Sequence, residues 1–216
     1  TAETRTMTLQ SMARAVTRTK PLSELPATAT SLATAVGDAS GSGTDTIDAT
    51  MQGLIEGVRG NAGLEDAEIA DVNQQVGTVG RSASTAFISS AEGNEAADIE
   101  AVADAVARGG AAGLAVQGLD RNLLRGLSRN MLDGGVGAAR ESNKPTVSRA
   151  MLQVLAEIVP PELRPVLPGQ EDELPGEGIE DGEDEGEGEE APATPAEPVA
   201  PPPPVNPVEP EDVSNF

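Results

Sequence analysis

Apolar residues recur at helical spacing through the first 160 residues of the chain. The clearest case lies in residues 45–58, where the steps of four, three, one and three positions join Ile47, Met51, Leu54, Ile55 and Val58. This spacing places the five side chains on one face of an α-helix. No stretch predicts a half-buried strand, because the valines recur at helical spacing. The pattern therefore predicts an all-α body.

A second apolar stripe runs through residues 65–88 with heptad-like steps of three and four. Its members are Ile69, Val72, Val76, Val79, Ala83 and Phe87. A repeat of this kind over about three heptads favours a coiled coil or a helical bundle. Gly77 and Gly80 weaken the helix, because a glycine in an exposed helix interior costs roughly 1 kcal/mol relative to alanine. We expect self-association of the chain to be mediated by Ile69, Val72, Val76, Val79 and Phe87.

Further helical patterns lie at 6–19, 95–108, 114–132 and 146–159. Asp45 and Asn94 precede two of the predicted helices and are the expected N-caps. Gly109 and Gly110 are expected to end the helix that begins after Asn94. The spacing of Gly53 from Gly57, and of Gly109 from Gly113, indicates close helix contacts, or else loose packing or a break. The body, residues 1–166, is thus predicted to contain six or seven helices.

The predicted core is lean because the chain has almost no aromatic residues. Among its 216 residues there is no Trp, Tyr, His or Cys, and the two phenylalanines are Phe87 and Phe216. An aromatic side chain normally buries about 150–250 Å², so aliphatic residues must supply the buried surface here. We expect a lean, Ala/Gly-rich helical bundle or helical assembly module that gains stability by association with copies of itself or with a partner.

The composition changes after residue 166. The net charge of the chain is −22, and all 14 basic residues precede residue 167. Sixteen of the 36 acidic residues lie between Glu171 and Asp212. Since such a segment has little apolar surface to bury, residues 167–216 are predicted to form a disordered acidic and proline-rich tail. The acidic run is a solubilising spacer in the simplest interpretation. The alternatives are diffuse Ca²⁺ binding, mimicry of nucleic acid and steering of a cationic partner.

The last eight residues, EPEDVSNF, combine three acidic side chains with Phe216. This order resembles the acidic, Phe-ended tip by which bacterial single-stranded-DNA-binding proteins recruit partners. The usual Pro before Phe is missing, and the rest of the chain has no counterpart in that family. The resemblance implies that Phe216 fills an apolar pocket of a partner whose basic rim pairs with Glu209, Glu211 and Asp212. An export or assembly signal and an incidental terminus are the alternatives.

Residues 119–132 place Arg121, Arg125 and Arg129 on one helix face and leucines on another. The basic face is a solvated bundle surface in the simplest interpretation, and contact with a membrane surface, a phosphate backbone or the acidic tail is the alternative. Three arginines in a net-acidic body do not predict nucleic-acid binding, for which a clustered basic face is typical.

The residue types exclude most catalytic chemistry. Without His or Cys, the common nucleophile–base pairs cannot form, and no G-x-S-x-G motif is present. We expect no catalytic residue, no cofactor and no metal site. No apolar stretch approaches the roughly 18 residues of a membrane span. The chain begins at Thr1, which slightly favours an extracellular or envelope location with a removed leader.

These observations predict a non-enzymatic structural or assembly protein that self-associates through helical faces, its acidic tail acting as a solvated brush or docking arm. The alternative is an adapter, scaffold or chaperone-like factor that recruits a partner through its acidic, Phe-ended C-terminus. A coat of amphipathic helices on polymer granules is a third hypothesis.

Overall fold

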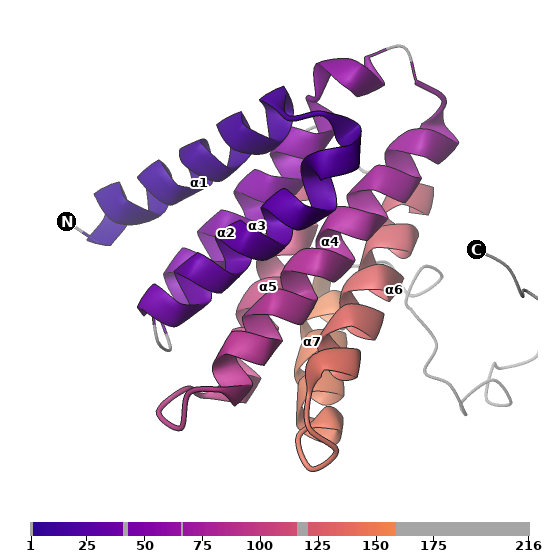
Figure 1. The fold of residues 1–216 in the computed structure, drawn as a ribbon. Coiled ribbons are helices and arrows are strands. Elements are labelled where there is room, and N and C mark those ends of the chain that lie inside the picture. The colour runs from indigo at the N-terminus through magenta and orange to yellow at the C-terminus, as the bar shows by residue number, and fades with distance from the viewer. Residues whose placement is uncertain (1, 41–42, 66, 116–120, 159–216) are drawn as a thin grey trace, which may run out of the picture. The chain divides into compact units, whose positions relative to one another are not determined.

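The computed structural model describes residues 2–40, 43–65, 67–115 and 121–158 (Figure 1). Within these ranges the chain is helical and contains no strand, which confirms the predicted all-α class. The predicted tail and the last eight residues of the predicted body lie outside the described residues. The α-helices are α1 (Ala2–Thr19), α2 (Leu25–Ser40), α3 (Thr44–Arg59), α4 (Ile69–Glu92), α5 (Ile99–Ala115), α6 (Arg121–Ala138) and α7 (Lys144–Ile158). Two 3₁₀ turns are η1 (Leu22–Glu24) and η2 (Ala62–Leu64).

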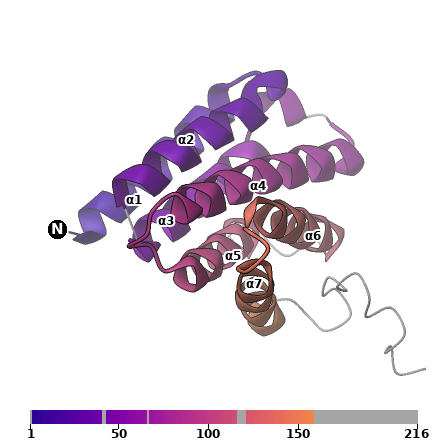
Figure 2. The ribbon, with the colours of Figure 1, turned by 60° about the horizontal axis from the view of Figure 1, so that its bottom comes forward.

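The helices form two layers. Each helix packs most extensively against the helix two positions along the chain, so that α1, α3, α5 and α7 form one layer and α2, α4 and α6 the other. Figure 2 shows α2, α4 and α6 following one another in this way. Neighbours within a layer run in the same direction, since Gly53 of α3 lies against Gln10 of α1 and Gly57 lies against Arg14. Stacked helix pairs of this kind are typical of α-solenoids, in which each unit contacts only its neighbours.

Aliphatic side chains and alanines fill the space between the layers. Phe87 is the one buried aromatic side chain among the described residues, and it is 1 % exposed. Around it the core is built from residues such as Leu54, Met51, Leu127 and Met131, each fully buried. Because alanine side chains are short, many contacts bring helix backbones close together rather than inserting large side chains between them.

Glycines make these close approaches possible. A Cβ on Gly57 would lie 2.5 Å from the carbonyl oxygen of Arg14, and one on Gly113 would lie 2.8 Å from the carbonyl oxygen of Gln52. Carbon atoms do not approach carbonyl oxygens this closely, so only glycine fits. The close-contact interpretation of the glycine spacing is therefore confirmed. The expected helix end at Gly109 and Gly110 is wrong, because α5 continues through both residues to Ala115.

Two expected N-caps are also wrong. The residue before α3 is Gly43, and Asp45 lies inside the first turn, where a carboxylate favours the helix dipole. At the start of α5, Asp98 accepts hydrogen bonds from the backbone amides of Glu100 (3.1 Å) and Ala101 (3.2 Å). Asn94 instead closes a turn further upstream by accepting from the amide of Ala96 at 3.0 Å.

Candidate interaction surfaces

The stripe predicted for self-association lies mainly inside the body. Val76 and Val79 are fully buried and Phe87 is 1 % exposed. Val72 is partly buried against the same core, whereas Ile69, the first residue of α4, is 65 % exposed. Side chains that pack against their own chain offer no surface to another copy. The self-association prediction therefore has to be revised for the three buried residues.

The predicted basic face lies on α6. Arg125 and Arg129 are exposed and make no ion pair with any other described residue. The side chain of Arg121 lies outside the described part. On the opposite face of α6, Leu123, Leu124, Leu127 and Met131 are buried. Between α4 and α6 the guanidinium of Arg81 lies 3.6 Å from the carboxylate of Asp133, so this layer surface carries charges of both signs.

The predicted docking residues Glu209, Glu211, Asp212 and Phe216 lie outside the described residues. Their role stays a prediction.

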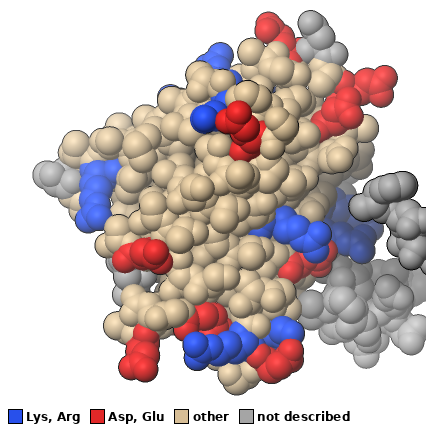
Figure 3. Space-filling model, in the orientation of Figure 1, with Lys and Arg blue, Asp and Glu red and all other residues tan. Residues whose placement is uncertain are grey.

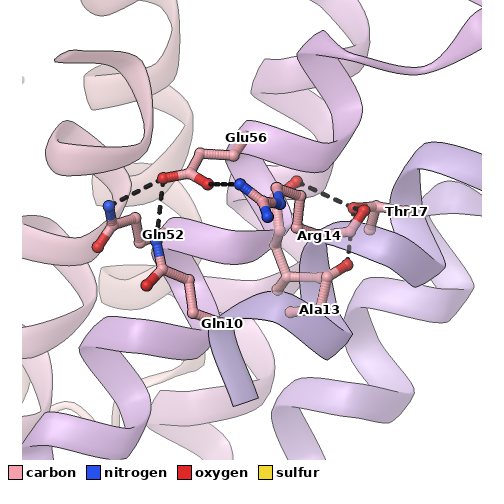
Figure 4. A network of polar contacts seen from close by, with 7 residues as sticks. Gln10, Ala13, Arg14, Thr17, Gln52 and Glu56 are labelled. Carbon is pink, nitrogen blue, oxygen red and sulfur yellow. Dashed lines mark hydrogen bonds and ion pairs between the residues drawn. The ribbon is translucent and has the colours of Figure 1, made fainter. Parts of the chain in front are cut away.

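A buried carboxylate joins α1 to α3 (Figure 4). Glu56 is 7 % exposed, and its Oε1 accepts hydrogen bonds from Nε2 of Gln52 (2.8 Å) and Nε2 of Gln10 (3.1 Å). The guanidinium of Arg14 lies 3.6 Å from Oε2. A charge this deeply buried needs such partners, since an unpaired one would cost several kcal/mol. The sequence signal for this site is a glutamate between the apolar residues of α3, and the apolar spacing alone does not predict that its carboxylate is buried.

A second carboxylate, that of Asp48, lies between α3 and α5. Burial raises its pKa above the ordinary value of 3.8, the positive charge of Arg108 opposes this rise, and Asp45 and Asp104 add to it. Arg108 itself donates a hydrogen bond of 2.8 Å to Asp104, which raises the pKa of the guanidinium. The raised pKa of Asp48 predicts that the stability of the protein depends on pH.

An uncharged face covers the outer sides of α1 and α2. Figure 3 shows a broad region without charged side chains over α1, α2 and α4, bordered by acidic and basic groups. Its exposed members on α1 and α2 are Met7, Thr8, Ser11, Met12, Ala15, Ala27, Thr30, Ser31, Thr34 and Ala35. Met7 is 62 % exposed and Met12 43 %. A mostly apolar groove of about 460 Å³ between the two helices is lined by residues that include Val16 and Leu32, and Glu24 is its one charged lining residue.

A basic pocket lies where α1 and α3 end. It has a volume of about 750 Å³, and its lining includes the cationic side chains of Arg18, Lys20 and Arg59. Pro21, Leu22 and Ala62 contribute apolar surface, and Glu65 is the acidic side chain among the lining residues. Basic residues at helix C-termini also complement the helix dipole, which accounts for the positions of Arg18 and Arg59.

Within the described residues, no group of three or more Asp or Glu side chains is placed to hold a metal ion. None of the described helices has the length and apolar character needed to cross a bilayer. No protein-family model, curated protein or solved structure matches the chain.

Proposed function

We propose that the protein is a non-enzymatic structural or assembly protein whose helical body associates with further copies of itself. The observation that carries this proposal is the uncharged face on α1 and α2, with Met7 and Met12 exposed on it. These two are among only three large apolar side chains, with Ile69, that are strongly exposed in the described part of the chain.

The position of this face in the fold supports the proposal. Helices α3 and α4 are each covered on both sides within their layers, but α1 and α2 have a layer neighbour on one side only. The end of a helical stack normally carries a polar, charged outer surface that keeps the protein soluble. On the uncharged face, the exposed side chains of α1 and α2 are instead Ala, Ser, Thr and Met, and the charged residues of the two helices lie outside this face. Covering its alanines costs almost no side-chain entropy, and the entropy lost by Met7 and Met12 is opposed by the apolar surface that they bury.

Sedimentation velocity over about a hundredfold concentration range tests this function. The chain is expected to form larger species as its concentration rises. The variants Met12→Glu and Ser31→Glu place a charge on the uncharged face and are expected to weaken association at least about tenfold. Gln153→Glu, an exposed residue of α7, is the matched control and should associate like the unaltered chain. A monomer at every concentration would contradict the proposal.

The second candidate is an adapter that recruits another protein through its acidic, Phe-ended C-terminus. The order of three acids followed by Phe216 in the last eight residues favours it. This function requires a monomeric or dimeric body and a partner whose binding is lost when Phe216 is deleted. The two candidate functions therefore predict different results. The adapter loses its binding partner when Phe216 is deleted, whereas the assembly protein loses self-association when a charge is placed on α1.

A further inference from the structure

We propose that the basic pocket binds the acidic, Phe-ended C-terminal segment, residues 209–216, of a second copy of the chain. This inference rests on the proposed self-association and names a second contact for it.

The pocket is held in shape by Asn61, which is 4 % exposed. Its amide nitrogen donates hydrogen bonds to the carbonyl oxygens of Thr17 (2.7 Å) and Lys20 (2.9 Å), where the chain leaves α1. Its amide oxygen accepts from the backbone amide of Gly63 at 2.8 Å, at the start of η2. One side chain thus ties the end of α1 to the segment after α3. The pocket does not have to be ordered at the moment of binding, which lowers the entropic cost.

The three cationic side chains of the pocket differ in how many contacts they already make within the chain. Arg18 is exposed and has no hydrogen bond or ion pair among the described residues. Lys20 lies 3.0 Å from Glu24, but both side chains are about half exposed, and such a pair contributes little. Arg59 is held in place because its Nη1 donates to the carbonyl oxygen of Leu114 at 2.8 Å, and its other N–H groups make no further hydrogen bond or ion pair among the described residues.

The combination of a basic rim with an apolar wall selects among ligands. A small inorganic anion would use only the cations. Pro21, Leu22 and Ala62 offer surface that an apolar group covers at the same time. The ligand that fits both parts carries several carboxylates and one apolar side chain within a few residues.

The chain carries such a ligand at its own C-terminus. Glu209, Glu211 and Asp212 supply three carboxylates, and Phe216 supplies the apolar side chain. Fifty residues lie between Ile158, the last described residue, and Glu209. A connection of this length leaves the segment within reach of the pocket of a neighbouring copy in an assembly.

A photo-cross-linking experiment on the full-length chain tests this contact. Since the chain has no cysteine, Asn215→Cys provides a single site for a benzophenone label. Labelled chain is mixed with ¹⁵N-substituted unlabelled chain and irradiated. The expected products join residue 215 to ¹⁵N-substituted peptides that contain Arg18–Leu22 or residues 60–63. Cross-links confined to the labelled copy itself, or to peptides far from the pocket, would overturn the proposal.

Charge-reversal variants provide a second test of the contact between the pocket and the segment. Arg18→Glu with Lys20→Glu reverses the rim, and Glu211→Lys with Asp212→Lys reverses the segment. Each double variant alone is expected to lose the cross-link roughly tenfold, and an equimolar mixture of the two should restore it, because each copy then finds an opposite charge on the other. Arg149→Glu, an exposed arginine of α7, is the control that should retain the cross-link.

The failure of this inference is distinguishable from the failure of the proposed function. If the chain associates with concentration but neither Phe216→Ala nor the charge reversals change the cross-links, only the pocket assignment fails. If the chain stays monomeric at every concentration, the proposed function fails. Circular dichroism of each variant establishes that the body is folded, and the tail variants leave the pocket residues unaltered in any case.

Discussion

Glu92 and Arg140 join the end of α4 to the segment after α6 through three contacts. The carboxylate of Glu92 accepts a hydrogen bond from the backbone amide of Arg140 at 2.9 Å and lies 3.3 Å from its Nε. The guanidinium also donates to the carbonyl oxygen of Glu92 at 3.0 Å, and Asn143 adds a hydrogen bond of 3.0 Å to the carboxylate. The side chain of Glu92 is 9 % exposed, whereas that of Arg140 is 72 % exposed, so water reaches these contacts from the arginine side.

We expect Glu92→Ala to lower the free energy of unfolding by about 1 kcal/mol, because it removes the acceptor of the Arg140 amide and of the Asn143 side chain, which are only partly protected from water. Urea denaturation followed by circular dichroism measures the change. Glu95→Ala is the matched control, since Glu95 is exposed and makes no hydrogen bond with other described residues. Equal stabilities of the two variants would show that the contacts of Glu92 contribute nothing.

Gly57→Ala should destabilise the contact between α1 and α3. The added methyl group would meet the carbonyl oxygen of Arg14 and the hydroxyl of Thr17, and the helices would have to separate. Overpacking of this kind costs typically about 1–3 kcal/mol.

Gly126→Ala on α6 should have the opposite effect on stability, because a Cβ there meets nothing within 4 Å. It should stabilise the protein by about 0.5–1 kcal/mol through helix propensity and the unfolded-state entropy. Thermal unfolding of the two variants must shift in opposite directions if the close approach is real.

The glycines also show what the sequence could and could not predict. The helical class followed from the spacing of Ile47, Met51 and Leu54, because a 3.6-residue period is a local property. The end of α5 did not, since Gly109 was interpreted as a helix terminator. Its helix continues because the glycine lies against the backbone of Asp48 in a neighbouring helix. The low helix propensity of glycine is thus outweighed by a tertiary contact, and no local sequence pattern reveals that contact.

The same limit applied to the candidate site. The apolar stripe of α4 predicts a packing surface, but sequence alone does not tell whether the packing partner belongs to the same chain. Two hydrophobic layers in one chain supply that partner through α2 and α6. The basic pocket was missed because Arg18 and Arg59 are 41 positions apart in the sequence and meet only through the parallel arrangement of α1 and α3.

Asp48 should make stability fall as the pH rises. Its pKa in the folded state is raised, chiefly by burial, so the folded protein binds this proton more tightly than the unfolded chain does. The stabilisation is complete below the ordinary aspartate pKa, near 3.8, and is lost as the pH rises through the folded-state pKa. Asp48→Asn should therefore be more stable than the unaltered protein at pH 7, and the difference should shrink toward pH 3.

Arg108→Gln should have the opposite effect on the pH dependence of stability from Asp48→Asn. Removing the guanidinium removes the interaction that opposes the rise in the pKa of Asp48. The stability of this variant should fall more steeply with pH than that of the unaltered chain. Urea midpoints measured from pH 3 to pH 7 provide the comparison. A pH profile unchanged by Asp48→Asn would mean that this carboxylate does not titrate differently in the folded and unfolded states.

Val76 and Ile69 belong to one sequence stripe but occupy different environments, and a charge should affect them differently. Val76→Asp places a carboxylate at a fully buried position with no partner, so we expect a loss of about 4 kcal/mol or more and an unfolded or partly folded chain. Ile69→Asp adds the same charge at the first residue of α4, where the side chain is 65 % exposed and the helix dipole favours it. Its unfolding free energy should stay within about 0.5 kcal/mol of the unaltered value. A Val76→Asp variant that is folded but monomeric would contradict this expectation. It would show that Val76 contacts a second copy, because the charge would then abolish association while the body stays folded.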